Sequence, residues 1–253
     1  MKRDYSIECR ERVAFIQRVL QESGLAGIVF GNSGGKDSAL VGALCKSACS
    51  NTVGVILPCG SKRNFSQDME DAKRIAKYFQ IETRIADLTP ARDALIKNLA
   101  ESTILNQAAL NNIAPRLRMT SLYAIGAAEG MLVAGTGNRS EAYVGYYTKW
   151  GDGAHDFNPI SDLTATEVIE FLDYLNAPDF ILKKAPSAAL YDGQTDEMEL
   201  GFSYAVLDAY LHGEEIPEEI RAKIERMHAA CAHKRRGILH YREAEERDHL
   251  ENI

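Results

Sequence analysis

The residues best suited to chemistry lie in one stretch near the start of the chain, Ser-Gly-Gly-Lys-Asp-Ser at positions 33–38. An apolar run at 27–30 precedes it, and an apolar segment of helical character begins at Ala39. A glycine turn between a buried strand and a helix directs several backbone N–H groups toward one point, where the helix dipole adds partial positive charge. The stretch therefore predicts a polyphosphate site, to which Ser33 and Ser38 add hydroxyl donors.

Asp37 is the unexpected residue in such a site. A carboxylate beside a phosphate is repelled unless a cation lies between them, so Asp37 predicts Mg²⁺. The pattern is not that of the Walker loop, which has four residues between its glycines and then Gly-Lys-Ser/Thr. An ordinary serine-rich turn that caps a helix is the alternative interpretation.

The elements that must hold this turn alternate between strand and helix as far as residue 135. Apolar runs predict strands at 27–30, 53–57, 81–86 and 131–135, and helical periodicity predicts helices at 5–23, 66–79, 89–102 and 108–129, the last with its true start at Pro115. This alternation predicts an α/β fold, a doubly wound parallel sheet with helices on both faces, in a single domain over residues 1–253. Ligands on such sheets bind at the carboxyl ends of the strands, so the segments after Phe30, Leu57 and Gly135 are expected to converge.

Composition excludes several classes of function. The net charge of −7 argues against broad nucleic-acid binding. The five cysteines form no Cys-x-x-Cys pair, which fits a reducing compartment and predicts a cytoplasmic protein. No signal peptide and no run of 18 apolar residues is present, so no membrane association is expected.

The opening stretch resembles the Ser-Gly-Gly-x-Asp-Ser signature of the ATP pyrophosphatase family, whose adenine-nucleotide alpha hydrolase-like members cleave ATP between the α and β phosphates. Four further stretches match one branch of that family in consistent order. They are Gly-Thr-Gly-Asn-Arg-Ser-Glu at 135–141, Gly-Tyr-Tyr-Thr-Lys-Trp-Gly-Asp-Gly-Ala-His-Asp at 145–156, Lys-Ala-Pro-Ser-Ala at 184–188 followed by Gly-Gln-Thr-Asp-Glu at 193–197, and His-Lys-Arg at 233–235. Together they resemble the ammonia-dependent NAD⁺ synthetases, from about residue 25 to residue 236.

This resemblance implies a reaction and a set of residues. ATP and Mg²⁺ would adenylate the nicotinate carboxylate of deamido-NAD⁺, and ammonia would attack the acyl-adenylate to give NAD⁺ and AMP. The implied ATP-binding residues are Gly31, Asn32, Ser33, Gly34, Gly35, Lys36, Asp37, Ser38, Thr136 and Ser187. Asp37 and Glu141 would hold Mg²⁺ and, with Lys36, carry the catalysis. The implied deamido-NAD⁺ contacts are Arg116, Lys149, Asp156, His233 and Lys234.

One departure from the family pattern bears on the phosphates. Ala165 stands where the family usually has a lysine, which removes a positive charge from the place where pyrophosphate leaves. Lys36, Lys183 and Lys184 are the candidates to compensate. Ser187 stands where threonine is commoner, and the hydroxyl is retained.

Other interpretations stay open at this point. The same chemistry on nicotinate mononucleotide would need almost the same motifs, and another ATP pyrophosphatase amidoligase would share the opening stretch. A nucleotide-binding sensor without chemistry would not need both Asp37 and Glu141. The family further implies a homodimer and, because the chain has no room for an amidase domain, free ammonia as the nitrogen donor. Residues 188–201 are expected to form a lid that ligands order.

Overall fold

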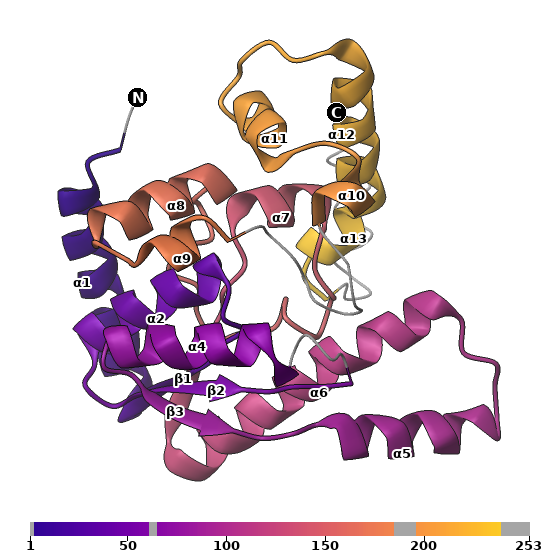
Figure 1. Cartoon of the computed structure of the whole chain (residues 1–253), viewed down its shortest axis with the longest axis horizontal. Coiled ribbons are helices and arrows are strands. Elements are labelled where there is room, and N and C mark those ends of the chain that lie inside the picture. Colours follow the sequence, from indigo (N-terminus) through magenta and orange to yellow (C-terminus); the bar gives the residue numbers. More distant parts are fainter. Residues whose placement is uncertain (1–2, 61–64, 185–195, 239–253) are drawn as a thin grey trace.

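The computed structural model describes residues 3–60, 65–184 and 196–238 (Figure 1). Its centre is a parallel sheet of β1 (Gly27–Gly31), β2 (Thr52–Ile56), β3 (Glu82–Ile85) and β4 (Met131–Ala134), in the order β3-β2-β1-β4. The register pairs Val29 with Val53 on one side of β1 and with Val133 on the other. The predicted α/β fold with a parallel sheet is thus confirmed. The strand order changes direction between β1 and β4, which is where open α/β sheets bind their ligands.

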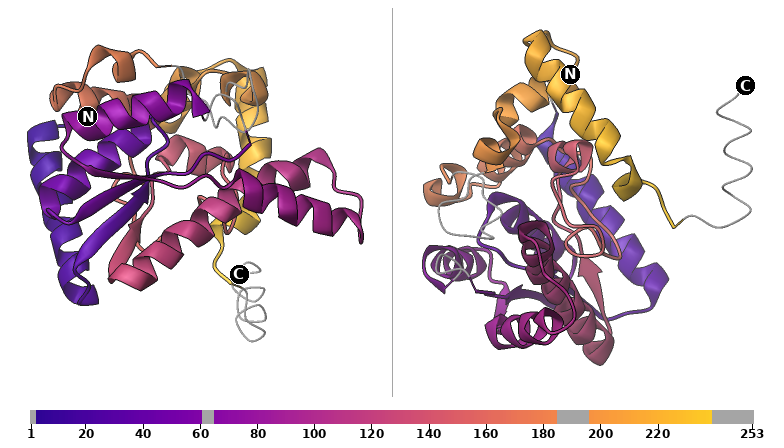
Figure 2. Two further views of the ribbon diagram at one scale, coloured as in Figure 1. Left: turned by 60° about the horizontal axis from the view of Figure 1, so that its bottom comes forward. Right: turned by 90° about the vertical axis from the view of Figure 1, so that its right-hand side faces the viewer.

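Helices cover both faces of the sheet (Figures 1 and 2). One face packs against α1 (Tyr5–Ser23), α2 (Lys36–Ala48), α4 (Gln67–Tyr78) and α8 (Ala165–Tyr174), which share one apolar core. The other face packs against α6 (Gln107–Glu129), with α5 (Thr89–Ala100) resting on α6. Because both faces are covered, β1, β2 and β4 are continuously buried or nearly so, as expected of a parallel sheet.

The C-terminal half adds a second apolar cluster beside the sheet. Leu200, Phe202, Tyr204 and Leu207 are buried in it, together with Ala165 at the start of α8. The further helices of this half are α7 (Arg139–Val144), α9 (Asp179–Leu182), α10 (Asp196–Leu200), α11 (Tyr204–Leu211), α12 (Glu218–Ala230) and α13 (Ala232–Arg235). Among them, α9 packs into the first core and not into this cluster. The short α7 contacts α8, α11 and α12, so this cluster fixes α7 above the strand ends.

The predicted helix start at Pro115 is wrong, because α6 begins at Gln107 and runs through the proline. Proline removes one helical hydrogen bond, but the surrounding turn is held by tertiary contacts. Pro115 is buried against the Thr148–Gly151 turn, and Asn112 accepts a hydrogen bond from the Thr148 hydroxyl at 2.7 Å. Among the described helices, none is both long and apolar enough to cross a membrane.

Candidate active site

Residues 32–38, which we call the phosphate loop, connect β1 to the first turn of α2. Asn32 holds this loop against α4. This buried side chain donates from Nδ2 to the carbonyl of Ala72 in α4 and accepts at Oδ1 from the backbone N–H of Gly34. Gly34 has φ +74°, and a Cβ there would stand 2.3 Å from the carbonyl oxygen of Asp68. The loop can therefore approach α4 this closely only with glycine at position 34.

The two serines of the loop behave differently. Ser38 is buried and donates to the carbonyl of Gly35, whereas Ser33 is exposed, and their hydroxyl oxygens lie 3.1 Å apart. Ser33 also accepts from the backbone N–H of Gly35. The two predicted donors thus lie side by side, and Ser33 is the one exposed to solvent.

Lys184 fastens the loop from outside. Its ammonium donates to the carbonyl of Gly34 at 2.9 Å and forms ion pairs with Asp68 at 2.9 Å and Asp71 at 2.8 Å. Lys183 is exposed and pairs with Asp179. Of the three lysines proposed to compensate for Ala165, these two are engaged elsewhere, and Lys36 is the one beside the acidic residues of the site.

Asp37 and Glu141 come from α2 and α7, and Asn138 holds both of them. Its Nδ2 donates to Asp37 Oδ1 at 2.9 Å, and its backbone N–H donates to Glu141 Oε2 at 3.1 Å. Asn138 is fully buried and, with Glu141, forms the capping box of α7. Burial first, and then the charge of Asp37, raises the pKa of Glu141 well above its ordinary range.

This donor set fits Mg²⁺. Mg²⁺ is commonly held by one or two carboxylates together with substrate phosphates and water. In the described ranges, no group of three or more His, Cys, Asp or Glu side chains is placed to hold a metal without a ligand. Asp37 and the buried Glu141, both hydrogen-bonded to Asn138 beside the phosphate loop, are oxygen ligands of the kind that Mg²⁺ accepts.

Lys36 shares this acidic setting. Its Nζ lies 3.2 Å from Asp37 Oδ2 and 5.5 Å from the ring centroid of Tyr204, whose hydroxyl donates to Asp196. Burial alone would lower the pKa of Lys36, but the carboxylates of Asp37, Glu141 and Asp196 raise it, so the ammonium stays charged. Asp196 and Tyr204 are residues of the site that sequence reasoning missed, although Asp196 lies within one of the matched stretches.

Thr136 is half-buried and follows β4, the strand next to β1, so it lies at the same edge of the sheet as the phosphate loop. The ring of His155 packs on Gly135, where a Cβ would meet it at 2.4 Å. Both carboxylate oxygens of Asp156 accept hydrogen bonds from within the protein. Oδ2 accepts from the backbone N–H of Val133 at 2.7 Å, and Oδ1 accepts from the Tyr123 hydroxyl. In this structure Asp156 therefore fixes the 151–156 turn against β4, and its contact with a ribose stays a prediction.

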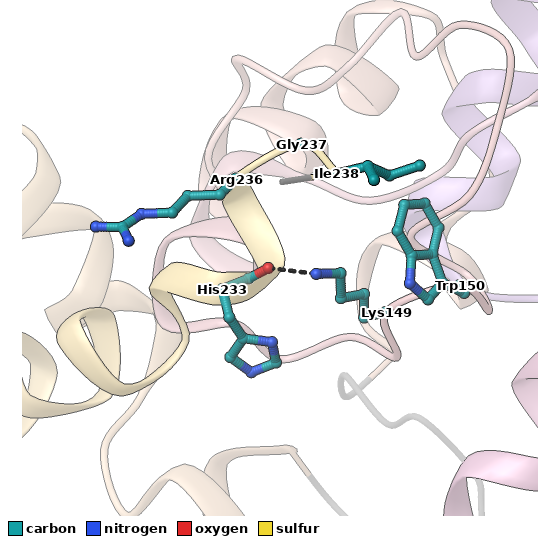
Figure 3. Close-up of a pocket in the computed structure, with 6 residues that line it drawn as sticks. All are labelled: Lys149, Trp150, His233, Arg236, Gly237 and Ile238. Carbon is teal, nitrogen blue, oxygen red and sulfur yellow. Dashed lines mark hydrogen bonds between the residues drawn. The ribbon is translucent and has the colours of Figure 1, made fainter. Parts of the chain in front are cut away.

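A cavity of about 480 Å³ is lined by Lys149, Trp150, His233, Arg236, Gly237 and Ile238 (Figure 3). Lys149 Nζ donates to the carbonyl of His233 at 2.6 Å, and the Arg116 guanidinium donates to the carbonyl of Lys149. Three of the five residues predicted to bind the dinucleotide are thus linked here. Trp150 is half-exposed and adds an aromatic surface, with φ +61°.

Lys234 is not among the residues that line this cavity. Its ammonium donates to the carbonyls of Gly145 and Tyr147 and lies 5.1 Å from the centroid of the Tyr147 ring. It therefore fastens the 145–147 turn to α13, and a direct contact with substrate stays a prediction.

Ser187 lies outside the described residues, as does 188–195 of the predicted lid. The remaining part of that segment, 196–201, includes α10.

A parallel sheet with a Ser-Gly-Gly turn and two carboxylates that share one hydrogen-bonding residue at its switch point is typical of enzymes that bind nucleotide phosphates. The comparison with known families identifies the branch: the chain belongs to the NAD synthase family, whose model matches residues 8–238. A curated relative, the NH₃-dependent NAD⁺ synthetase of Carboxydothermus hydrogenoformans, is 42% identical over 239 residues, covering 93% of this chain and 97% of that protein.

Two solved structures are similar over almost the whole chain. The NMN synthetase of Francisella tularensis superposes with a TM-score of 0.89 at 33% identity, covering 94% of this chain and 99% of that one. The NH₃-dependent NAD synthetase of Campylobacter jejuni superposes with a TM-score of 0.79 at 31% identity, covering 94% and 100%. The fold and the family are therefore shared by enzymes named for two different products.

Proposed function

We propose that this protein joins ammonia to deamido-NAD⁺ at the expense of ATP, releasing NAD⁺, AMP and pyrophosphate. The observation that carries the proposal is the contact of Asn138 with both Asp37 and Glu141 at the mouth of the phosphate loop. A carboxylate is a poor acyl acceptor, and adenylation converts one of its oxygens into a good leaving group. The protein must therefore hold two polyanions together and stabilise the charge on departing pyrophosphate.

The phosphate loop supplies the positioning. Backbone N–H groups at the start of α2 and the Ser33 hydroxyl bind the β and γ phosphates, while Thr136 binds from the end of β4. Asp37 and Glu141 would hold Mg²⁺, which would supply positive charge to neutralise the phosphate oxygens. Asn138 orients both carboxylates, so the two acidic side chains are set before the nucleotide arrives.

The acid substrate is bound from the other side of the site. The cavity at Lys149, Trp150 and His233 offers a cation, an aromatic surface and a hydrogen-bonding ring, which suits a pyridine ring or nucleotide bearing negative charge. Arg116 adds a second cation beside Lys149. Ammonia as the nitrogen donor is supported by the names of the curated relative and of the Campylobacter enzyme. A homodimer is part of the proposal through family resemblance.

The same chemistry on nicotinate mononucleotide is the second candidate, favoured by the likeness to the Francisella NMN synthetase. Both acids carry the reacting ring, so the residues around Asp37 and Glu141 serve either one. The two candidates differ in whether a second nucleotide half has to be bound.

The deciding experiment compares the two acids directly. Purified protein is supplied with ATP, Mg²⁺ and an ammonium salt or glutamine, and AMP and the amide product are quantified with each acid. The proposal expects a higher kcat/KM for deamido-NAD⁺ than for the mononucleotide, with ammonia and not with glutamine. A preference for the mononucleotide would establish the second candidate, and the absence of AMP with either acid would contradict both.

A further inference from the structure

Lys36 places a buried positive charge where the proposed function requires a metal ion. Its side chain is 6% exposed, and its Nζ lies 3.2 Å from the carboxylate of Asp37. Glu141 and Asp196 also act electrostatically on this ammonium. One lysine thus lies among three carboxylates, two of which are the proposed metal ligands.

Lys36 and Lys184 both contact the phosphate loop, but they have different partners. It is the first residue of α2 and so belongs to the phosphate loop itself. Lys184 is held by Asp68, Asp71 and the carbonyl of Gly34, on the other side of the loop. Removing the Lys36 charge therefore changes the acidic cluster without loosening the contacts that hold the loop against α4.

We propose that Lys36 is a tethered counter-cation of the acidic cluster, which partners Asp37 and Glu141 when no nucleotide is bound and turns to the phosphates when ATP arrives. Mg²⁺ then enters the site together with the nucleotide rather than before it. This inference rests on the proposed function for the identity of the metal and the nucleotide.

The physical reason is competition between two cations for the same carboxylates. A charge within a few ångströms in a partly desolvated site opposes the binding of a second cation. A lysine side chain has a flexible four-carbon stem, so its ammonium can leave the carboxylates without movement of the backbone. The triphosphate offers the ammonium a new anionic partner and adds oxygen ligands for Mg²⁺, so both changes favour metal binding only once nucleotide is present.

The test measures metal binding without nucleotide, so that activity is not the readout. Mn²⁺ is titrated into wild-type protein, Lys36→Met and Lys183→Met, and free Mn²⁺ is followed by electron paramagnetic resonance. Both substitutions remove one positive charge, but Lys183 is exposed and pairs with Asp179. Lys36→Met is expected to bind Mn²⁺ about tenfold more tightly than the other two proteins. Adding Asp37→Asn to Lys36→Met should abolish that gain.

Lys36→Arg keeps the charge and is expected to bind Mn²⁺ as the wild type does. In the wild type, millimolar Mg²⁺ alone should shift the Tm by less than about 1 °C, which can be measured even if Lys36→Met does not fold. Equal Mn²⁺ affinity in Lys36→Met and Lys183→Met, or a large Tm shift of the wild type by Mg²⁺ alone, would overturn the inference. Gain of affinity in a protein that amidates neither acid would leave the inference standing and refute the proposed function instead.

Discussion

Asn138 donates a hydrogen bond from its side-chain nitrogen to Oδ1 of Asp37 at 2.9 Å, although the two residues lie 101 positions apart in the chain. The same residue caps α7 and donates from its backbone to Glu141. One residue therefore both caps α7 and contacts the two acidic groups, Asp37 through its side chain and Glu141 through its backbone N–H. This makes Asn138 a positioning residue for the proposed metal site.

Replacing Asn138 with Ala should affect both stability and activity. Loss of the cap is expected to lower the free energy of unfolding by about 1 kcal/mol. Loss of the orientation of Asp37 should lower kcat/KM about tenfold and raise the Mg²⁺ concentration needed for half-maximal activity. Denaturant unfolding and a Mg²⁺ titration of activity measure the two effects.

Thr164→Ala is the matched control, because Thr164 is also a fully buried cap and forms the capping box of α8 with Glu167. It should lose similar stability and keep the Mg²⁺ dependence of the wild type. The same shift of Mg²⁺ dependence in both variants would assign the effect of Asn138 to helix stability and remove it from the metal site.

Lys184 is expected to matter for stability and for ATP binding together. Lys184→Met removes the cation shared by Asp68 and Asp71 and the hydrogen bond to Gly34, and breaking a largely buried ion pair costs about 3 kcal/mol. The loop would lose a brace, so the KM for ATP should rise about tenfold. Lys183→Met, which breaks an exposed pair, should change stability by less than about 1 kcal/mol and leave the KM unchanged. An unchanged KM in Lys184→Met would show that Asn32 alone positions the loop.

The general architecture could be predicted from sequence because its signals are local. Buried parallel strands appear as short apolar runs. The turn after β1 could be recognised because it directly follows one such run and directly precedes a segment of helical character. The carboxyl ends of parallel strands meet at one sheet edge, which is why Asp37 and Glu141 could be expected together. Their role as metal ligands stays a prediction.

The contacts that sequence reasoning missed depend on long-range packing. Lys184 reaches Gly34 across 150 positions, and nothing in its local sequence distinguishes it from the exposed Lys183. Lys234 lies in a basic run that is equally compatible with substrate binding, and only the fold shows that it donates to two carbonyls. Sequence alone predicts a helix start at Pro115 because proline is disfavoured inside a helix, whereas the Thr148–Gly151 turn that packs against it comes later in the chain.

The ion pairs between α1 and the segment before α8 give a pH-dependent prediction. Arg12 donates to both carboxylate oxygens of Asp162, at 2.6 and 2.9 Å. Burial alone would raise the pKa of Asp162, but this hydrogen bonding and the charge of Arg12 lower it. A pKa lowered by folding stabilises the protein fully above the ordinary value of about 3.9 and ceases to do so as the pH falls through the lowered value.

Arg12→Met should therefore be less stable than the wild type at neutral pH, and the difference should shrink as the pH falls below about 4. Denaturant unfolding followed by circular dichroism at a series of pH values measures it. Arg12→Lys keeps the charge without the two-point contact and should lie between the two proteins. A difference that stays constant with pH would mean that Arg12 acts through its hydrogen bond to the carbonyl of Pro159 and the packing of its stem, and not through its pairing with Asp162.

Trp150 combines an unfavourable backbone conformation with a place in the cavity that Lys149 and His233 also line. A bulky residue with φ +61° is strained, yet the indole is half-exposed and lies 5.4 Å from Lys149 Nζ. Trp150→Gly relieves the strain and removes the aromatic surface. We expect the free energy of unfolding to change by less than about 1 kcal/mol, because relief of strain offsets lost contacts. If Trp150 stacks on the acid substrate, its KM should rise about tenfold.

Gln80→Gly provides the control for the effect of the backbone conformation, since Gln80 has φ +55° in the turn between α4 and β3 and is not among the residues that line the cavity at Trp150. It should gain about 0.5–1 kcal/mol of stability and keep the wild-type KM. Trp150→Phe keeps an aromatic ring and the strained backbone, so it should retain most of the affinity for the acid. A KM that rises equally in Trp150→Gly and Trp150→Phe would point to shape rather than stacking. An unchanged KM in both would place the indole outside the substrate site.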